Sequence, residues 1–196
     1  MCRIGVLALQ GSFREHVQAL TKCAVHAYEV RLPDQLKAAD GLIVPGGEST
    51  VIDKLIKKYG FKAHLDHFFR AGKPMMGTCA GMIMLAGKVL GQDIGWGYIN
   101  LTVERNAYGR QIDSFEQDID LNLNCRKGQD FKGIFIRAPK IVKVGTDVQI
   151  LGMLGKEAVL VRQNHVVACS FHPELCRDLR IHQYFVQMIK KNKRES

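Results

Sequence analysis

Short, almost wholly apolar segments that end at glycine-bearing turns are the feature of this sequence that most constrains its fold. Residues 3–9 alternate little between polar and apolar side chains and end at Gln10-Gly11-Ser12. Residues 41–44 form a second such segment, which ends at Pro45-Gly46-Gly47, and a stretch with helical spacing follows each. Strands of a parallel sheet have this composition because helices cover both of its faces. The pattern predicts a three-layer α/β fold with a mostly parallel central sheet.

The remaining elements are predicted from the same periodicity. We expect helices over residues 13–23, 50–58, 61–71 and 177–191. Thr50 and Asp53 have the spacing of a capping box at the start of the second helix. Beyond residue 95 the strand candidates become shorter and suggest added or antiparallel strands, at residues 100–104, 133–136, 148–152, 158–162 and 166–171. No linker, repeat or low-complexity stretch interrupts the sequence, so we expect one domain over residues 1–196.

Residues 77–81, Gly-Thr-Cys-Ala-Gly, have the pattern of a sharp turn that exposes one thiol. Glycine two positions on either side of Cys79 reproduces the nucleophile elbow, with sulfur in place of oxygen. A helix that starts beside the sulfur favours the thiolate, which is the reactive species. A buried structural cysteine between two packing glycines fits the same residues. This segment alone does not decide between the two interpretations.

Three turns are expected to meet at one edge of the sheet. Ligands of open α/β sheets bind beyond the carboxyl ends of the strands, and this rule brings Gln10, Gly46-Gly47 and Cys79 together. Paired glycines before a helix offer unobstructed backbone N–H groups, which can stabilise an oxyanion during acyl transfer. A plain strand-to-helix turn explains the same glycines.

Among the seven histidines, His172 has the best context for a base that serves a cysteine nucleophile. It follows the strand candidate at residues 166–171, and Glu174 lies two positions further on, where it is able to orient the imidazole. A surface His-Pro-Glu turn is the alternative. His64 and His67 lie three apart on a predicted helix, and a solvated helix face explains them better than metal binding does.

The net charge of +9 raises the possibility of a nucleic-acid partner. Part of the excess lies in the C-terminal tail, at Lys190, Lys191, Lys193 and Arg194. No aromatic stripe is interleaved with the basic residues, and no nucleic-acid motif is present. A solvated helix end, or a surface that docks on an acidic partner, explains the charge more simply, and RNA binding remains a minor alternative.

Composition and cysteine usage indicate a soluble cytoplasmic protein. The 46% hydrophobic and 24% charged residues are ordinary for a globular chain, no apolar stretch approaches a membrane span, and the strand-like start predicts no leader peptide. The six cysteines form no CxxC pair and are interpreted as free thiols in a reducing compartment. Cys169, His172 and Cys176 lack an evident fourth ligand, so we expect no metal site.

Cys79 in Gly-Thr-Cys-Ala-Gly, with His172 and Glu174 in Phe-His-Pro-Glu, resembles the class I, triad-type glutamine amidotransferases. The resemblance narrows to the glutaminase subunits of pyridoxal 5′-phosphate synthase and covers essentially the whole chain. The segments that carry it are residues 5–11, 45–50, 77–81, 103–106, 109–111, 113–116, 135–139 and 170–175. The Glu-Arg-Asn, Asp-Ser-Phe-Glu and Ile-Arg-Ala-Pro blocks distinguish these subunits from other triad amidotransferases, such as that of imidazole glycerol phosphate synthase.

The resemblance implies a fold like that of flavodoxin and hydrolysis of L-glutamine to L-glutamate and ammonia through a glutamyl thioester. In this interpretation Cys79 is the nucleophile, His172 the proton carrier and Glu174 the group that orients it. The oxyanion hole is assigned to Gly47 and Ala80 with the loop at Gln10. Glutamine binding is assigned to Gly46, Gly47, Glu48, Ser49, Arg105, Ile136 and Arg137. No cofactor and no metal are implied.

The resemblance also implies a partner. Ammonia would pass to a synthase subunit, a (β/α)₈ barrel, within a large hetero-oligomer. Family members tend to be poor glutaminases alone, and docking is thought to complete the site through the loop matching Gln10-Gly11. A scaffolding subunit that keeps the fold without catalysis is the alternative from another class, and intact Cys79, His172 and Glu174 argue against it.

Overall fold

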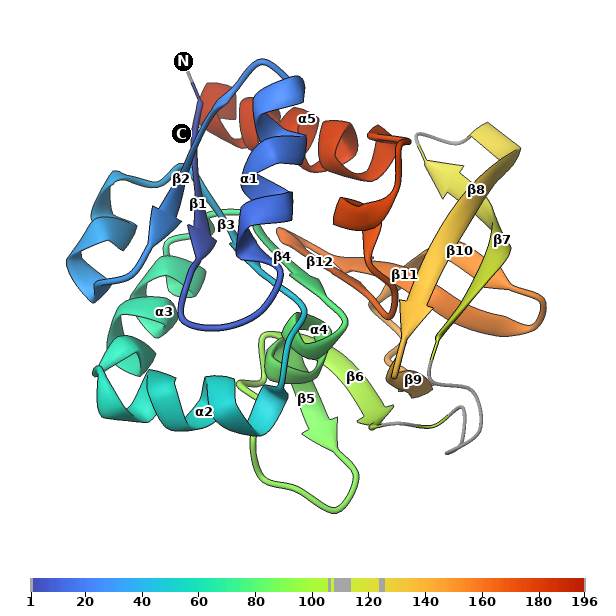
Figure 1. Ribbon diagram of the computed structural model, residues 1–196, viewed down its shortest axis with the longest axis horizontal. Coiled ribbons are helices and arrows are strands. Elements are labelled where there is room, and N and C mark those ends of the chain that lie inside the picture. Colours follow the sequence, from blue (N-terminus) through green and yellow to red (C-terminus); the bar gives the residue numbers. More distant parts are fainter. Residues whose placement is uncertain (1, 106, 108–113, 124–125, 196) are drawn as a thin grey trace.

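A nine-stranded sheet runs through the middle of the molecule in the computed structural model, which describes residues 2–105, 107, 114–123 and 126–195 (Figure 1). The strand order is β2 (His26–Val30), β1 (Arg3–Leu7), β3 (Gly41–Val44), β4 (Met75–Thr78), β12 (Val166–Cys169), β11 (Glu157–Gln163), β10 (Gln149–Leu154), β7 (Ser114–Leu123) and β8 (Arg126–Ile136). The first five strands in this order are parallel, and the other four extend the sheet in antiparallel fashion. The predicted α/β fold with added antiparallel strands is confirmed.

Helices cover both faces of the parallel part (Figure 1). The helices are α1 (Phe13–Lys22) and α5 (Arg180–Glu195) on one face and α2 (Ser49–Lys58), α3 (Phe61–Arg70) and α4 (Ala80–Leu85) on the other. Successive side chains of β3 show why its sequence is apolar throughout. Leu42 and Val44 belong to the core beneath α2 and α3, whereas Ile43 belongs to the core beneath α1 and α5. All three are fully buried, as the period of two in a strand requires.

A second, three-stranded sheet packs beside α4 (Figure 1). It consists of β5 (Ala86–Val89), β6 (Ile99–Glu104) and β9 (Lys140–Val144). The buried side chains of β6, Leu101 and Val103, join the core beneath α2 and α3. This sheet places Arg105, which follows β6, beside the carboxyl ends of the parallel strands. Two 3₁₀ helices, η1 (Pro33–Ala38) and η2 (Pro173–Leu175), complete the described elements.

Two predicted helix starts differ from the structure. The capping box at Thr50 and Asp53 is wrong, because α2 begins at Ser49 with Glu48 as N-cap, and the Thr50 hydroxyl donates to Glu48 Oε1 (3.1 Å). The last helix runs over Arg180–Glu195 instead of residues 177–191. Its start is fixed by Asp178, whose carboxylate accepts a hydrogen bond from the backbone N–H of Arg180 (2.9 Å).

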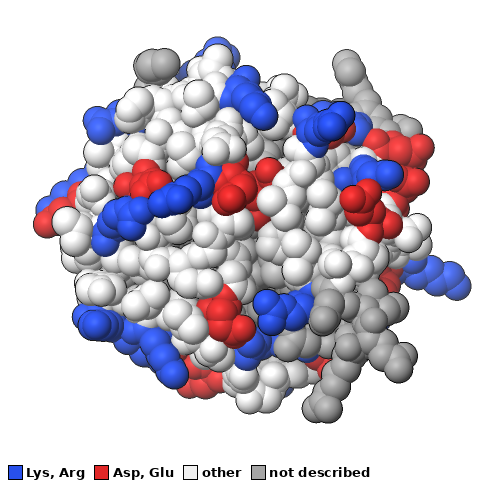
Figure 2. Space-filling view, in the orientation of Figure 1, with Lys and Arg blue, Asp and Glu red and all other residues white. Residues whose placement is uncertain are grey.

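Basic side chains are dispersed over the face of the molecule that Figure 2 shows. On the face shown in Figure 2, lysines and arginines alternate with acidic residues. The basic residues of the tail are exposed on the last turns of α5, as expected for a solvated helix end, and one of them, Lys193, pairs with Asp40 (2.9 Å). Within the described residues, no helix has both the length and the apolar character needed to cross a bilayer.

Candidate active site

Cys79 sits at a strained turn between β4 and α4. Its φ of +49° and ψ of −107° are unusual for a residue with a side chain, and such strain concentrates at functional sites. The flanking glycines are required by close backbone contacts. A Cβ at Gly77 would lie 2.6 Å from backbone atoms of Gly81, and one at Gly81 would lie 1.9 Å from the carbonyl oxygen of Val44. The structure therefore has the geometry of the predicted nucleophile elbow.

His172 and Glu174 lie beside this elbow, at the carboxyl end of β12. His172 Nδ1 is 2.7 Å from Glu174 Oε1, and both side chains are almost fully buried. Gly46 shows that the imidazole and the thiol are neighbours, because a Cβ on Gly46 would lie 2.4 Å from His172 Cε1 and 3.4 Å from Cys79 Cβ. A thiol, an imidazole and a carboxylate are thus arranged in series.

Burial and hydrogen bonding act in opposite directions on the two ionisable partners. Burial by itself would lower the pKa of His172, but its interactions with Cys79 and Glu174 raise the pKa to about 10. Burial would likewise raise the pKa of Glu174, but His16 and His172 facing it, with the Ser12 hydroxyl, lower the pKa to about 2. At neutral pH Glu174 is therefore a carboxylate and His172 an imidazolium that is able to donate a proton.

The glycine pair after β3 forms the wall opposite the elbow. The carbonyl oxygen of Gly46 accepts a hydrogen bond from the backbone N–H of Ser12 (3.0 Å). Because the C=O and N–H of a trans peptide point in opposite directions, the N–H of Gly47 points away from the Ser12 loop. Gln10 does not line the pocket but packs against Gly47. Its Oε1 accepts a hydrogen bond from the N–H of Glu48 (2.8 Å).

A small pocket of about 130 Å³ opens in front of Cys79. Its lining residues are Gly47, Glu48, Ser49, Cys79, Ala80, Ile83, Arg105, Ile136, Arg137 and His172. Arg105 donates to Glu48 Oε1 and to Gln92 Oε1, both at 2.8 Å. The carbonyl oxygen of Ile136 lies 3.8 Å from Cys79 Sγ, and Arg137 has a positive φ of +43°. The structure thus brings together the residues that the sequence predicted, with Gly46 and Gln10 behind the pocket wall.

Some predicted positions lie outside the described residues. They are Asn106, residues 109–111 and Asp113 of the motif blocks, and Cys125. The five cysteines that are described are free. His172 faces Glu174, while Cys169 and Cys176 donate to backbone carbonyls, and the described part of the chain holds no cluster of metal-ligating side chains.

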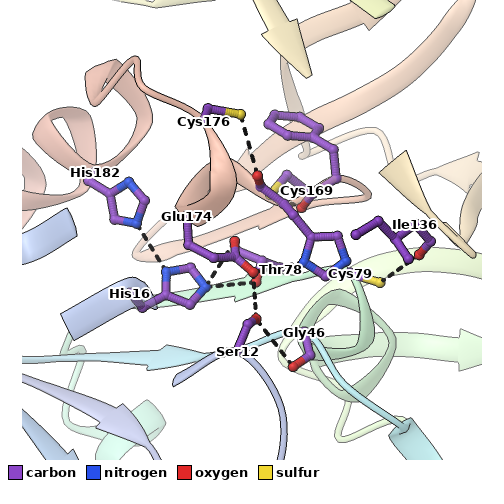
Figure 3. A network of polar contacts seen from close by, with 12 residues as sticks. Ser12, His16, Gly46, Thr78, Cys79, Ile136, Cys169, Glu174, Cys176 and His182 are labelled. Carbon is purple, nitrogen blue, oxygen red and sulfur yellow. Dashed lines mark hydrogen bonds and ion pairs between the residues drawn. The ribbon is translucent and has the colours of Figure 1, made fainter. Parts of the chain in front are cut away.

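Four polar side chains behind Glu174 were not predicted from the sequence. Ser12 Oγ donates to Glu174 Oε1 (2.5 Å), and His16, Thr78 and His182 continue the network away from the pocket (Figure 3). The one local signal is the spacing of Ser12 and His16, which lie one helical turn apart and therefore share a face. His182 comes from a helix 166 residues further along the chain and has no such signal.

The three-layer fold is one that glutamine amidotransferases share. A crystal structure of a glutamine amidotransferase superposes with a TM-score of 0.89 at 45% identity, over 95% of this chain and 98% of that one. Residues 6–191 match the profile of the SNO glutamine amidotransferase family, and the chain belongs to this family.

Curated relatives match over nearly the whole length. Proteins from Halalkalibacterium halodurans and Anoxybacillus flavithermus, both named pyridoxal 5′-phosphate synthase subunit PdxT, are 50% and 49% identical. The matches cover 98% of this chain in each case, and 97% and 100% of the relatives. PurLQS from Thermotoga maritima, at 19% identity and a TM-score of 0.73 over 97% of this chain and 98% of that one, shares the fold alone.

Proposed function

We propose that this chain hydrolyses L-glutamine to L-glutamate and ammonia with Cys79, His172 and Glu174 as its catalytic residues. The observation that carries the proposal is the serial arrangement of these three groups. The imidazole is 2.7 Å from a buried carboxylate on one side and neighbours the strained thiol of the elbow on the other. A nucleophile, a proton carrier and an orienting group in this order are what acyl transfer requires.

The pocket suits the two ends of a free amino acid. Glutamine carries an α-carboxylate and an α-ammonium group, and the Arg105–Glu48 pair offers a partner of opposite charge to each. Ser49 adds a buried hydroxyl that lines the pocket and has no hydrogen-bond partner among the described residues. A buried group of this kind is stabilised when substrate supplies the missing bond.

The reaction follows from these positions. The Cys79 thiolate adds to the side-chain amide carbon of glutamine, and the N–H groups of Gly47 and Ala80 bind the oxyanion. His172 donates its proton to the amide nitrogen, the C–N bond breaks, and ammonia leaves a glutamyl thioester. The neutral imidazole then takes a proton from water as the water attacks the thioester, which releases glutamate and restores Cys79 and the imidazolium.

We also propose that the ammonia passes to a (β/α)₈-barrel synthase subunit in a hetero-oligomer that makes pyridoxal 5′-phosphate in the cytoplasm. The names of the relatives, pyridoxal 5′-phosphate synthase subunits, support this partner over that of another triad amidotransferase. The decisive experiment mixes the chain with a synthase subunit and its two sugar phosphates. Glutamine should then replace free ammonia in forming pyridoxal 5′-phosphate, and no product with glutamine would contradict the proposal.

Covalent labelling tests the nucleophile directly. A diazoketone analogue of glutamine should add one adduct to the native chain, and peptide mapping should place it on Cys79. Cys79→Ala should remain unlabelled, whereas Cys176→Ala, which removes a cysteine outside the pocket lining, should label normally. A folded native chain that takes no label in the presence of the synthase subunit would favour a scaffolding role.

A further inference from the structure

We propose that His16, on α1, is a positioning residue that holds the Glu174 carboxylate through its Nε2–H, and that His182, on α5, fixes the tautomer of His16 that does so. The inference builds on the proposed function, because it concerns the orienting group of the same triad. Neither histidine touches the pocket, and both are fully buried. Histidine is seldom buried so completely without a polar role.

The contacts form one chain of polar groups from α5 to the triad (Figure 3). His182 Nε2 lies 3.0 Å from His16 Nδ1. His16 Nε2 lies 3.0 Å from Thr78 Oγ1 and 3.2 Å from Glu174 Oε2. Glu174 Oε1 already accepts from His172 and Ser12, and Oε2 has no well-aligned hydrogen bond among the described residues. His16 is therefore the group placed to hold the second carboxylate oxygen.

Electrostatics determines where the protons lie along this chain. A bare Nε2 lone pair on His16 would face the Glu174 carboxylate at 3.2 Å and be repelled by it, so Nε2 carries the proton. Nδ1 of His16 is then an acceptor and requires Nε2–H on His182. This leaves the Nδ1 of His182 as a bare acceptor, and that atom is indeed buried without a partner. The opposite tautomer would bury an unpaired N–H donor there, which is rarer in proteins.

Both imidazoles remain neutral in this arrangement. Burial lowers the pKa of His16 and outweighs the opposing effects of Glu174 and Glu15, while His172 lowers it further. Burial and the neighbouring His16 lower the pKa of His182 to about 3, against the effect of Glu174. A neutral His16 turns the positive end of its Nε2–H dipole toward Glu174 at 3.2 Å without neutralising it, so the carboxylate keeps its full charge for the imidazolium of His172. His182 keeps His16 neutral, because its Nε2–H donates to His16 Nδ1, the nitrogen at which a second proton would bind.

Nitrogen NMR of the full chain reads the proposed tautomers without reference to activity. In ¹⁵N-labelled protein, long-range ¹H–¹⁵N spectra should show Nε2 protonated and Nδ1 bare in both His16 and His182, unchanged from pH 7 to 9. The His16→Gln and His182→Leu variants assign the signals. A proton on Nδ1 of His16, or titration of either ring within this range, would overturn the inference.

Kinetics with the synthase subunit present test the consequence. His16→Leu should lower kcat roughly 10- to 100-fold, by analogy with the loss found when the hydrogen-bond partners of metal ligands are removed, with KM nearly unchanged. His16→Gln should restore most of kcat because its amide nitrogen reaches the place of Nε2. His67→Leu, at an exposed site on α3, is the matched control and should behave as the native chain.

The two hypotheses fail in different ways. A native chain without glutaminase activity would contradict the proposed function, and the NMR tautomers would still decide the role of His16. An active native chain whose kcat is unaffected by His16→Leu would overturn the positioning role alone. Should His16→Leu fail to fold, the spectra of the native chain keep the inference falsifiable.

Discussion

Glu48 and Arg105 form an ion pair across the mouth of the pocket, with 2.8 Å between Oε1 and Nη2. The two residues come from the start of α2 and the end of β6, so the small sheet is tied to the parallel one at the site. Arg105 is mostly buried, and Gln92 accepts a second hydrogen bond from it. Under the proposed function, each residue of the pair would exchange this partner for a charged group of glutamine.

Removing the charge of Arg105 should weaken glutamine binding more than it slows the chemistry. We expect Arg105→Gln to raise KM by roughly 10-fold or more, the cost of losing a charge-assisted hydrogen bond, with kcat within a few-fold of the native value. Arg31→Gln breaks an exposed arginine–glutamate pair away from the site and should leave both constants unchanged. A fall in kcat at constant KM would instead place Arg105 among groups that act in the transition state.

The pKa of His172 makes stability depend on pH. It is raised from 6.5 to about 10 on folding, so its contribution is fully present below pH 6.5 and is lost as the pH rises towards 10. The free energy of unfolding of the native chain, minus that of His172→Gln, should therefore fall by on the order of a few kcal/mol over this range. Denaturant titrations at pH 6.5, 8 and 10 measure the difference. A constant difference would show that His172 is not held as the imidazolium.

The elements that the sequence predicted best are the short strands in the middle of the parallel sheet, whose side chains are apolar because both faces are covered. β1, β3 and β4 are short, buried and apolar, so composition alone identifies them. The β7–β8 hairpin was predicted only at residues 133–136, because β7 alternates polar and apolar residues irregularly, half of it is exposed, and pairing with its neighbour holds it. Strand β2 was missed for the same reason, since its exposed and half-buried side chains give no apolar run.

The residues of the candidate site likewise fall into those that a short sequence pattern predicts and those that it does not. Cys79 was predictable because the two glycines that its turn needs lie two positions on either side of it, and the His172–Glu174 pair because only one residue separates its members. The His16–His182 contact joins residues 166 apart, and no short-range pattern marks it. The choice of Arg105 and Arg137 among the 28 lysines and arginines came from the family resemblance, since charge alone singles out neither.

Gly46 should tolerate no side chain. A Cβ there would lie 2.4 Å from His172 Cε1, so Gly46→Ala must displace the imidazole from the thiol. We expect kcat to fall on the order of 100-fold, because misplacement by about 1 Å costs this much. Gly72→Ala is the matched control: it meets no atom within 4 Å but has a positive φ, so it should cost stability and leave kcat intact. Normal activity of Gly46→Ala would show that the imidazole has room to move.

The backbone strain at Cys79 predicts that a glycine there increases stability relative to alanine, although both substitutions abolish activity. At φ +49° and ψ −107° any side chain costs roughly 1–3 kcal/mol, which glycine largely avoids. Cys79→Gly and Cys79→Ala both remove the thiol, but Ala retains the strain. After allowance for the greater entropy of glycine in the unfolded chain, the free energy of unfolding of Cys79→Gly, measured by denaturant titration, should exceed that of Cys79→Ala by about 1 kcal/mol. A Cys79→Gly variant that is less stable than Cys79→Ala by roughly the entropic cost of glycine, about 0.5–1 kcal/mol, would mean that the elbow stores no strain.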